Sequence, residues 1–324
     1  MKALTLEKYG LPEEVLRFTN QKIPTYQKNE VLVKIHFTAI NDYDWSLVRG
    51  KPFIYRLMFG LVKPKSKNLG MELSGTVEAV GSEVTEFDIG DEVYGDTSAY
   101  GFGTFSEYIA LPANALVHKP KNMSFEEAAA LPHAALLALQ GLKDIGGIKN
   151  GMKVLINGAG GGVGTLALQL AKTHHCEVTG VDLQEKFEAL SNLGYDHLIN
   201  YQHENFTENG IQYDLILDCK TDKSPFSYSR SLTANGVYVS IGGKITYLLS
   251  TLIIGKALSA FSSKRFEILS LKPNQGLKEI EEMYVNNQIK PVIDGPYPLS
   301  LGPEKLQEFG NGYHIGKIIL SLGT

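Results

Sequence analysis

One stretch of the chain, Lys153 to Asp182, restricts the possible folds more than any other. It begins with the apolar run Lys153–Asn157, which is typical of a buried parallel strand. The glycine-rich run Gly158–Gly164 follows, in which the backbone can turn sharply and lie close to a ligand. Leucines and alanines then recur at helical spacing, so the strand leads directly into a helix. A second apolar run, Glu177–Val181, ends at Asp182, about twenty residues after the glycines.

This order of strand, glycine turn, helix, strand and acid predicts a dinucleotide site. The helix start offers unpaired N–H groups and a positive dipole end to a diphosphate, and the acid reaches the adenosine ribose. The fingerprint G-x-G-x-x-G fits Ala159–Gly164 with alanine in the first place. A glycine-rich surface loop is the alternative, but such loops rarely lie between an aliphatic strand and an amphipathic helix. The residues predicted to contact the nucleotide here are Gly158, Ala159, Gly161, Gly162, Val163, Gly164 and Asp182.

The remainder of the chain predicts two domains of an α/β protein, for which 324 residues are sufficient. Residues 1–118 contain short alternating runs such as Val31–Phe37, separated by glycine turns, which predict a partly open β-barrel. Residues 119–290 alternate helices and strands, as in a doubly wound parallel sheet. The last strand, Gly316–Leu320, is placed back in the first domain, so residues 291–324 join it.

Composition excludes several classes of protein. A net charge of −4 gives no indication of a nucleic-acid partner. Only Cys176 and Cys219 occur, too few for a disulfide framework or a four-cysteine zinc lobe. The N-terminus lacks the apolar run of a signal peptide, and the most apolar stretch, Ile245–Phe261, is short and interrupted by Lys256. We therefore expect a cytoplasmic protein without a membrane span.

Two further segments have readable local signals. Ser124 and Glu127 have the spacing of a capping box, which predicts a helix that Pro132 must kink or restart. The basic segment Lys51–Asn68 contains aromatic and aliphatic residues. It is either a surface loop or helix packed by its aromatics, or a flap over the active site.

Several separate motifs carry a resemblance to a known family. They are Gly70–Gly81, Asp88–Tyr94, Phe105–Tyr108, Glu126–Pro132 and Gly158–Gly164. In this order they resemble the medium-chain dehydrogenase/reductase superfamily, and most of all its zinc-independent quinone oxidoreductase and enone reductase branch. The resemblance implies a GroES-like substrate domain, a Rossmann cofactor domain and a homodimer.

The resemblance also bears on metal binding and on the chemistry. It places Asn41, Met71 and His133 where the zinc enzymes of the superfamily carry their metal ligands. An amide and a thioether are poor zinc ligands, so we predict no catalytic metal. Without a Lewis acid, the alkoxide formed from an isolated ketone lacks its usual stabilisation, whereas an enolate or quinol needs only hydrogen-bond donors. The hypothesis is NAD(P)H-dependent hydride transfer to a quinone or an α,β-unsaturated carbonyl.

Four residues are candidates for the chemistry. Asn41 resembles the nicotinamide-facing asparagine of the branch, and its alternative role is that of a turn residue. Asp44 and Ser46 follow on the same loop and line the predicted substrate pocket; some relatives carry tyrosine in place of Ser46. His133 orients substrate or donates a proton, and a hydrogen-bonded structural histidine is equally compatible with the sequence.

The cofactor type depends mainly on Asp182. A carboxylate there accepts hydrogen bonds from the ribose of NAD(H) and repels a 2′-phosphate, while Lys186 and Tyr201 soften that preference. The sequence thus favours NAD(H) slightly over NADP(H). Three further residues resemble positions along the nicotinamide and phosphates, although a strand-end turn and a solvated lysine are their ordinary alternatives. They are Gly242, Gly243 and Lys317.

Two other functions fit the same sequence. One is a zinc-free alcohol or aldehyde dehydrogenase, and the other is an NAD(P)H-binding sensor or adaptor without turnover. A steady-state screen of cofactor oxidation with quinones, enones, aldehydes and alcohols separates the three.

Overall fold

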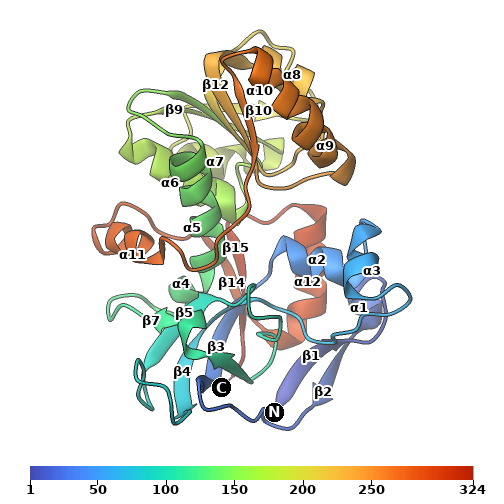
Figure 1. Cartoon of the computed structure of the whole chain (residues 1–324), viewed down its shortest axis with the longest axis vertical. Coiled ribbons are helices and arrows are strands. Elements are labelled where there is room, and N and C mark those ends of the chain that lie inside the picture. Colours follow the sequence, from blue (N-terminus) through green and yellow to red (C-terminus); the bar gives the residue numbers. More distant parts are fainter. Residues whose placement is uncertain (324) are drawn as a thin grey trace. The chain divides into compact units, whose positions relative to one another are not determined.

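The computed structural model describes residues 1–323, which divide into two units (Figure 1). Unit 1 comprises residues 1–133 and the C-terminal segment from Ile293, and unit 2 comprises Ala134–Val292. Within the described residues, no helix has both the length and the apolar character needed to cross a bilayer.

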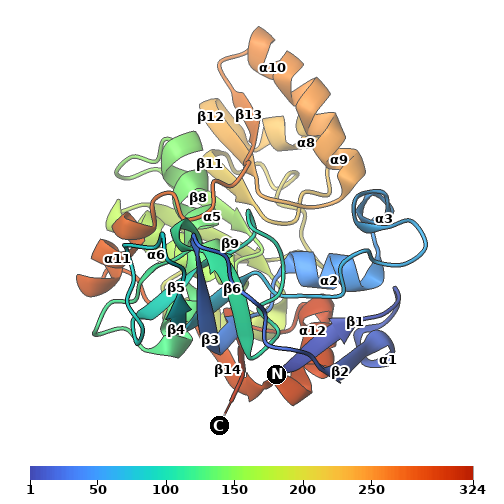
Figure 2. The ribbon, with the colours of Figure 1, turned by 60° about the horizontal axis from the view of Figure 1, so that its bottom comes forward.

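Unit 1 is built on a mixed, largely antiparallel sheet in the order β14-β15-β3-β4-β5-β7, with β6 also paired to β3 (Figure 2). Its strands are β3 (Glu30–Ala39), β4 (Glu72–Val80), β5 (Glu92–Asp96), β6 (Tyr108–Pro112), β7 (Val117–His118), β14 (Ile293–Pro298) and β15 (Lys317–Ser321). In β3 the alternate residues Val31, Val33 and Ile35 are buried, which confirms the predicted half-buried strand. Antiparallel pairing of Ile319 with Ala39 confirms that the last strand returns to this unit.

Several elements of unit 1 have no counterpart in the sequence prediction. They are the ribbon of β1 (Lys2–Leu6) and β2 (Leu16–Asn20), strand β14, and helices α1 (Pro12–Val15), α2 (Asp42–Arg49) and α12 (Gly302–Asn311). The basic segment 51–68 contains helix α3 (Ile54–Phe59). Strand β6 begins only at Tyr108, and before it the Ser106 hydroxyl lies within hydrogen-bond distance of the carbonyls of Gly103 and Tyr108.

Helix α4 (Phe125–Ala130) begins at the predicted capping box. The Ser124 hydroxyl accepts a hydrogen bond from the Glu127 N–H at 3.2 Å, and the Glu127 carboxylate accepts one from the Ser124 N–H at 3.1 Å. As expected, Pro132 restarts the chain as helix α5 (Pro132–Leu139). Because α4 packs on β3 and β4, residues 119–133 lie in unit 1, and the structural division falls after residue 133, not at residue 118.

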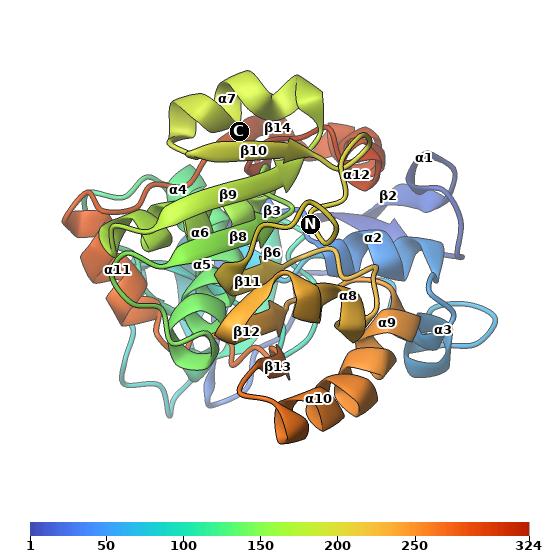
Figure 3. The same ribbon diagram turned by 90° about the horizontal axis from the view of Figure 1, so that it is seen from above.

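Unit 2 contains, in its described residues, a parallel sheet in the order β10-β9-β8-β11-β12-β13 (Figure 3). Its strands are β8 (Lys153–Asn157), β9 (Glu177–Asp182), β10 (His197–Asn200), β11 (Tyr213–Asp218), β12 (Leu232–Ser240) and β13 (Arg265–Ile268). Its helices are α6 (Gly162–Thr173), α7 (Phe187–Leu193), α8 (Pro225–Arg230), α9 (Ile245–Ser250), α10 (Lys256–Phe261) and α11 (Leu277–Val285). The strand order reverses between β8 and β11, where such sheets bind ligands at the carboxyl ends of their strands. The predicted Rossmann-type fold is thereby confirmed.

Candidate functional site

The turn after β8 has the backbone geometry of a diphosphate site. The chain reverses at Gly158, whose φ is +91°, and α6 begins at Gly162 with Gly161 as an N-cap that has no side-chain cap. A Cβ on Gly164 would lie 2.3 Å from the Gly158 carbonyl oxygen, so the helix and the strand end approach as only glycine allows. The N–H groups and dipole of this twelve-residue helix fit the diphosphate of a nicotinamide nucleotide.

Asp182, at the end of β9, is tied to this turn. One carboxylate oxygen accepts a hydrogen bond from the Gly160 N–H at 2.7 Å, and the other accepts one from the Leu183 N–H at 2.9 Å. The Lys186 ammonium lies 3.2 Å from the second oxygen, and both side chains are buried. The structure thus brings Asp182 and Lys186 together as a neutral ion pair beside the glycine turn.

The other predicted nucleotide residues of unit 2 lie at strand ends. The Tyr201 N–H donates to the Asp182 carbonyl at 3.4 Å, and the Tyr201 side chain is exposed. Gly242 and Gly243 follow β12 and pack on Thr221, whose N–H donates to the Gly242 carbonyl at 2.9 Å. A strand-end turn accounts for the two glycines locally, and their contact with a cofactor stays a prediction.

A buried polar cluster lies in unit 1 where β3, β4 and β15 meet. The Asn41 amide nitrogen donates to the Glu72 carboxylate at 2.9 Å, while the Lys317 ammonium donates to the Asn41 amide oxygen at 2.6 Å. The same ammonium donates to Glu72 at 2.7 Å. All three side chains are buried, so both ends of the Asn41 amide are held in one orientation. Lys317 is therefore not a solvated lysine.

Asn41 also begins helix α2 and is linked there to Asp44. The Asn41 N–H donates to one Asp44 oxygen at 2.9 Å, and the Gly70 N–H donates to the other at 2.8 Å. Burial raises the pKa of Asp44 to about 6, against the opposing effect of these two N–H groups. Asp44 thus joins the start of α2 to the turn that precedes β4.

Ser46 lies two residues after Asp44 on α2, beside a phenol that the sequence analysis missed, that of Tyr55. The Ser46 side chain is buried, and it lies near enough to the Tyr55 hydroxyl to oppose the rise in the pKa of that phenol. Burial raises the pKa of Tyr55 to about 12, with a contribution from neighbouring Tyr43 and Asp42. A phenol therefore stands beside the position at which some relatives carry tyrosine. Sequence spacing gave no signal for it, because Tyr55 belongs to another helix.

His133 is held to the same cluster by two contacts. Its backbone N–H donates to Glu72 at 2.6 Å, and its Nδ1 lies 2.8 Å from the Asp96 carboxylate at the end of β5. Burial alone would raise the pKa of Asp96, but the hydrogen bond and charge of His133 outweigh it and hold that pKa below its usual range. Since Asp96 accepts at Nδ1, the Nε2 of His133 is the nitrogen left to exchange a proton.

The structure links four of the five predicted residues of unit 1 to one carboxylate, directly or through Asn41. They are Asn41, Asp44, His133 and Lys317. Ser46 lies on the same helix as Asp44, beside Tyr55. Sequence analysis missed that carboxylate, Glu72, although an acid within the apolar motif Gly70–Gly81 is a readable signal. It also missed Asp96. Within residues 1–323, no three histidine, cysteine or acidic side chains are grouped to hold a metal ion.

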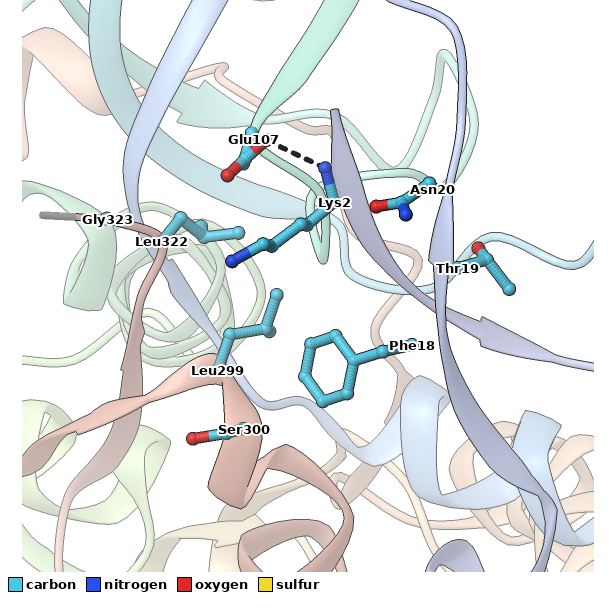
Figure 4. Close-up of a pocket in the computed structure, with 9 residues that line it drawn as sticks. All are labelled: Lys2, Phe18, Thr19, Asn20, Glu107, Leu299, Ser300, Leu322 and Gly323. Atoms are coloured by element: carbon cyan, nitrogen blue, oxygen red, sulfur yellow. Dashed lines mark hydrogen bonds between the residues drawn. The ribbon is translucent and has the colours of Figure 1, made fainter.

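A separate pocket of about 490 Å³ lies elsewhere in unit 1 (Figure 4). Its walls come from β1, β2 and the C-terminal segment, with Phe18, Leu299 and Leu322 on its apolar side. Lys2 lines it as well, and the Lys2 N–H donates to the Glu107 carboxylate at 2.7 Å. None of the candidate residues borders this pocket, so we assign it no part in the chemistry.

Comparison with known proteins decides the family. Residues 27–121 match the alcohol dehydrogenase GroES-like domain, and residues 193–320 match the zinc-binding dehydrogenase family. The mitochondrial NAD(P)H oxidoreductase RTN4IP1 of Bos taurus is 30% identical over 99% of this chain and 89% of its own length. The 2-methylene-furan-3-one reductase of Solanum lycopersicum is 30% identical over 99% of the chain and 79% of its own length.

The chain belongs to the medium-chain dehydrogenase/reductase superfamily. A solved structure, the quinone oxidoreductase from Coxiella burnetii, superposes on it with a TM-score of 0.89 and 27% identity, covering 100% of this chain and 99% of the other. Membership confirms the predicted branch of quinone oxidoreductases and enone reductases and the GroES-like and Rossmann-type folds. This superfamily member is an oxidoreductase that uses a nicotinamide nucleotide.

Proposed function

We propose that this oxidoreductase transfers hydride from NADH or NADPH to a quinone or an α,β-unsaturated carbonyl, without zinc. One observation carries the proposal: a buried ammonium, that of Lys317, lies between Asn41 and Glu72. Asn41 occupies the position that resembles the first zinc ligand of the zinc enzymes. A cation of the protein itself is therefore already bound at the place expected for the metal.

The surrounding donors support a zinc-free reaction. The Met71 thioether and the Asn41 amide bind zinc poorly. His133 uses its Nδ1 on Asp96. A divalent ion would also meet the charge of Lys317 at short range in a buried setting, where Coulomb repulsion is poorly screened. Reduction of a conjugated carbonyl avoids the need for such an ion, because its developing charge is delocalised.

Each of the residues of unit 1 has a separate role in the proposed reaction. A bound nicotinamide supplies the hydride. Lys317 and Glu72 fix Asn41, and Asp44 fixes the loop that carries it. His133, oriented by Asp96, delivers the proton from Nε2 to the reduced substrate. Hydrogen bonding by Ser46 and Tyr55 stabilises the substrate oxygen.

On the nucleotide side, the neutral pair of Asp182 and Lys186 supports the use of both cofactors. Asp182 disfavours a 2′-phosphate, and Lys186 offsets much of that repulsion. We expect NADH to be favoured slightly. The homodimer, the cytoplasmic location and the absence of a nucleic-acid partner stay predictions.

A steady-state screen tests the proposal. Purified protein is assayed for NADH and NADPH oxidation with quinones, enones, aldehydes and alcohols, alongside metal analysis. We expect turnover with quinones or enones that chelators leave unchanged. In the same assay, His133→Gln should lower kcat about a hundredfold while the affinity for NADH is retained.

Three outcomes contradict the proposal. Zinc-dependent turnover of alcohols would restore the alternative of an alcohol dehydrogenase. Zinc-free turnover confined to alcohols or aldehydes would favour the corresponding dehydrogenase. Tight nucleotide binding without turnover on any of these substrates would indicate a sensor or adaptor.

A further inference from the structure

The segment of residues 51–67, here called the α3 segment, places large apolar side chains on the surface of unit 1. Five of them are more than half exposed, and Val62 is 84% exposed. These five are Phe53, Leu57, Met58, Leu61 and Val62. Residues of this kind are usually buried, and a contiguous exposed group marks a surface that binds something.

The same segment is strongly basic. It contains five cations and no acid, whereas the whole chain has a net charge of −4. The segment is therefore positively charged in a protein that is negatively charged overall. The four lysines are exposed: Lys51, Lys63, Lys65 and Lys67. Arg56 is anchored, since its guanidinium stacks over the Tyr9 ring at 4.7 Å and donates to the Gly50 carbonyl at 3.2 Å. An acid lies near the segment but outside it: the exposed Asp42, on α2, whose negative charge helps to raise the pKa of Tyr55.

The segment is held in place, so these side chains point outward as a fixed feature. The Tyr9 hydroxyl donates to the Gly60 carbonyl at 2.7 Å, and the Leu6 N–H donates to the Lys67 carbonyl at 2.8 Å. Tyr55 stacks on Phe59, and Phe59 contacts Phe102 edge-on. Figure 2 shows α3 and the loop after it at the rim of unit 1. The half-buried aromatic rings thus pack inward, which leaves Phe53, the exposed aliphatic side chains and the lysines for a partner.

We propose that the α3 segment docks unit 1 onto an anionic lipid membrane. Exposed lysines lie before and after the apolar group, an arrangement in which cations contact acidic headgroups while apolar tips reach the acyl boundary. A protein partner would need a surface that is both acidic and apolar, whereas an anionic bilayer offers both properties everywhere. This proposal does not rest on the reaction assigned above, because membrane binding is measured without substrate.

Vesicle sedimentation tests the charge component. The full chain is mixed with phosphatidylcholine vesicles with or without phosphatidylserine. We expect binding only to the anionic vesicles, weakened by added salt. The variant Lys63→Gln/Lys65→Gln/Lys67→Gln should lose about fivefold in partition for each lysine, or roughly a hundredfold in all. The matched control is Lys22→Gln/Lys28→Gln/Lys121→Gln, which removes equal charge from exposed positions elsewhere on unit 1 and should bind like the parent.

A second variant tests the apolar component. Leu57→Ser/Met58→Ser/Leu61→Ser/Val62→Ser should abolish the binding that remains at high salt, whereas the control Ile89→Ser/Tyr313→Ser, also on exposed positions, should retain it. Each variant is used only if its thermal transition matches that of the parent. The lysine variant, which changes exposed ends alone, keeps the proposal testable if the apolar variant fails to fold.

Four results overturn the proposal. The first is absence of vesicle binding by the parent chain, as expected if the partner were a protein. The second is equal binding by the lysine variant and its control. The third is loss of binding only in Leu249→Ser/Ile253→Ser/Phe261→Ser, which changes the other exposed apolar stretch, in unit 2. The fourth is a changed KM for a water-soluble substrate in the lysine or the apolar variant, with vesicle binding unchanged. That result would indicate that the segment is a flap over the active site.

Discussion

Each unit of this protein buries a lysine against a carboxylate, and the two pairs are built in different ways. In unit 2, Lys186 and Asp182 are four positions apart and 3.2 Å from each other, and both lie against Gly160 of the glycine turn. In unit 1, Lys317 and Glu72 are 245 positions apart in sequence, and their atoms lie 2.7 Å from each other. The first pair can be read from a motif, whereas the second exists only because β15 and β4 flank β3.

The difference bears on what each pair does. Asp182 also accepts a hydrogen bond from the backbone N–H of Gly160. The close packing of the glycines already fixes the shape of this turn, so the ion pair of Asp182 and Lys186 determines mainly the charge beside it. Glu72 instead accepts from Asn41, His133 and Lys317 at once, so its pair holds together the side chains proposed for the chemistry. We therefore expect the unit 1 pair to matter mainly for stability and turnover, and the unit 2 pair for cofactor choice.

Lys317→Met should have the largest effect. It leaves the fully buried Glu72 without its cation, and breaking one partner out of a buried pair costs about 3–5 kcal/mol. Urea denaturation measures the change in the free energy of unfolding. In Lys317→Met/Glu72→Leu both charges are gone, so much of that stability should return.

An exposed ion pair provides the control for this experiment. Lys143 and Glu279 are 2.6 Å apart with side chains 52% and 40% exposed, so Lys143→Met should cost less than about 1 kcal/mol. An equal loss of unfolding free energy in Lys143→Met and Lys317→Met would show that burial does not increase the contribution of the unit 1 pair to stability.

Asp44 gives the next prediction, in the dependence of stability on pH. Its pKa is raised from 3.8 to about 6 in the folded chain, so folding favours its protonated form. The stability that this group contributes is complete below about pH 4 and is lost as pH rises through about 6. A shift of about two pKa units corresponds to roughly 3 kcal/mol.

Asp44→Asn should therefore remove a fall in stability between about pH 4 and pH 6, measured by denaturation at several pH values. The variant loses an acceptor for one N–H at every pH, so the slope is the diagnostic quantity. Asp96, whose pKa is lowered, contributes stability that is lost as the pH falls, so its effect has the opposite sign and occurs at lower pH. It is present in both the parent and the variant. Parallel pH profiles of parent and variant would contradict the raised pKa.

Gly164→Ala tests the rigidity of the unit 2 turn. Its new Cβ would lie 2.3 Å from the Gly158 oxygen and 2.5 Å from the Ala159 oxygen, and neither backbone atom can move cheaply. We expect a loss of about 1–3 kcal/mol in stability and weaker nucleotide binding, by calorimetry. Gly242→Ala is the matched control for stability alone, because its Cβ would meet nothing within 4 Å, whereas Gly242 is itself predicted to contact the cofactor. Equal tolerance of both substitutions would mean that the turn yields readily.

Local patterns in the sequence predicted much of this structure. Strands β8 and β9 and helix α6 have a clear apolar period, and the capping box of α4 lies within four residues. Helix α2 was missed because its box uses Asp44 in place of the usual glutamate or glutamine. The hydrogen bond between Lys317 and Glu72 and the proximity of Ser46 to Tyr55 depend on strand register and helix packing, which short-range spacing does not encode. The sequence thus suggests candidate residues, whose roles stay predictions, but not the partners that these residues have in the structure.

Asp182→Asn should have the smallest effect and should separate the two pairs most cleanly. It removes the charge that disfavours a 2′-phosphate and frees Lys186 to attract one, so the ratio of kcat/KM for NADPH to that for NADH should rise about tenfold. Lys186→Gln should move the same ratio in the opposite direction, with kcat nearly constant in both variants. Steady-state kinetics with a single quinone measures both ratios. If either substitution lowered kcat strongly while the cofactor ratio stayed fixed, the unit 2 pair would act on the chemistry and the contrast between the two units would fail.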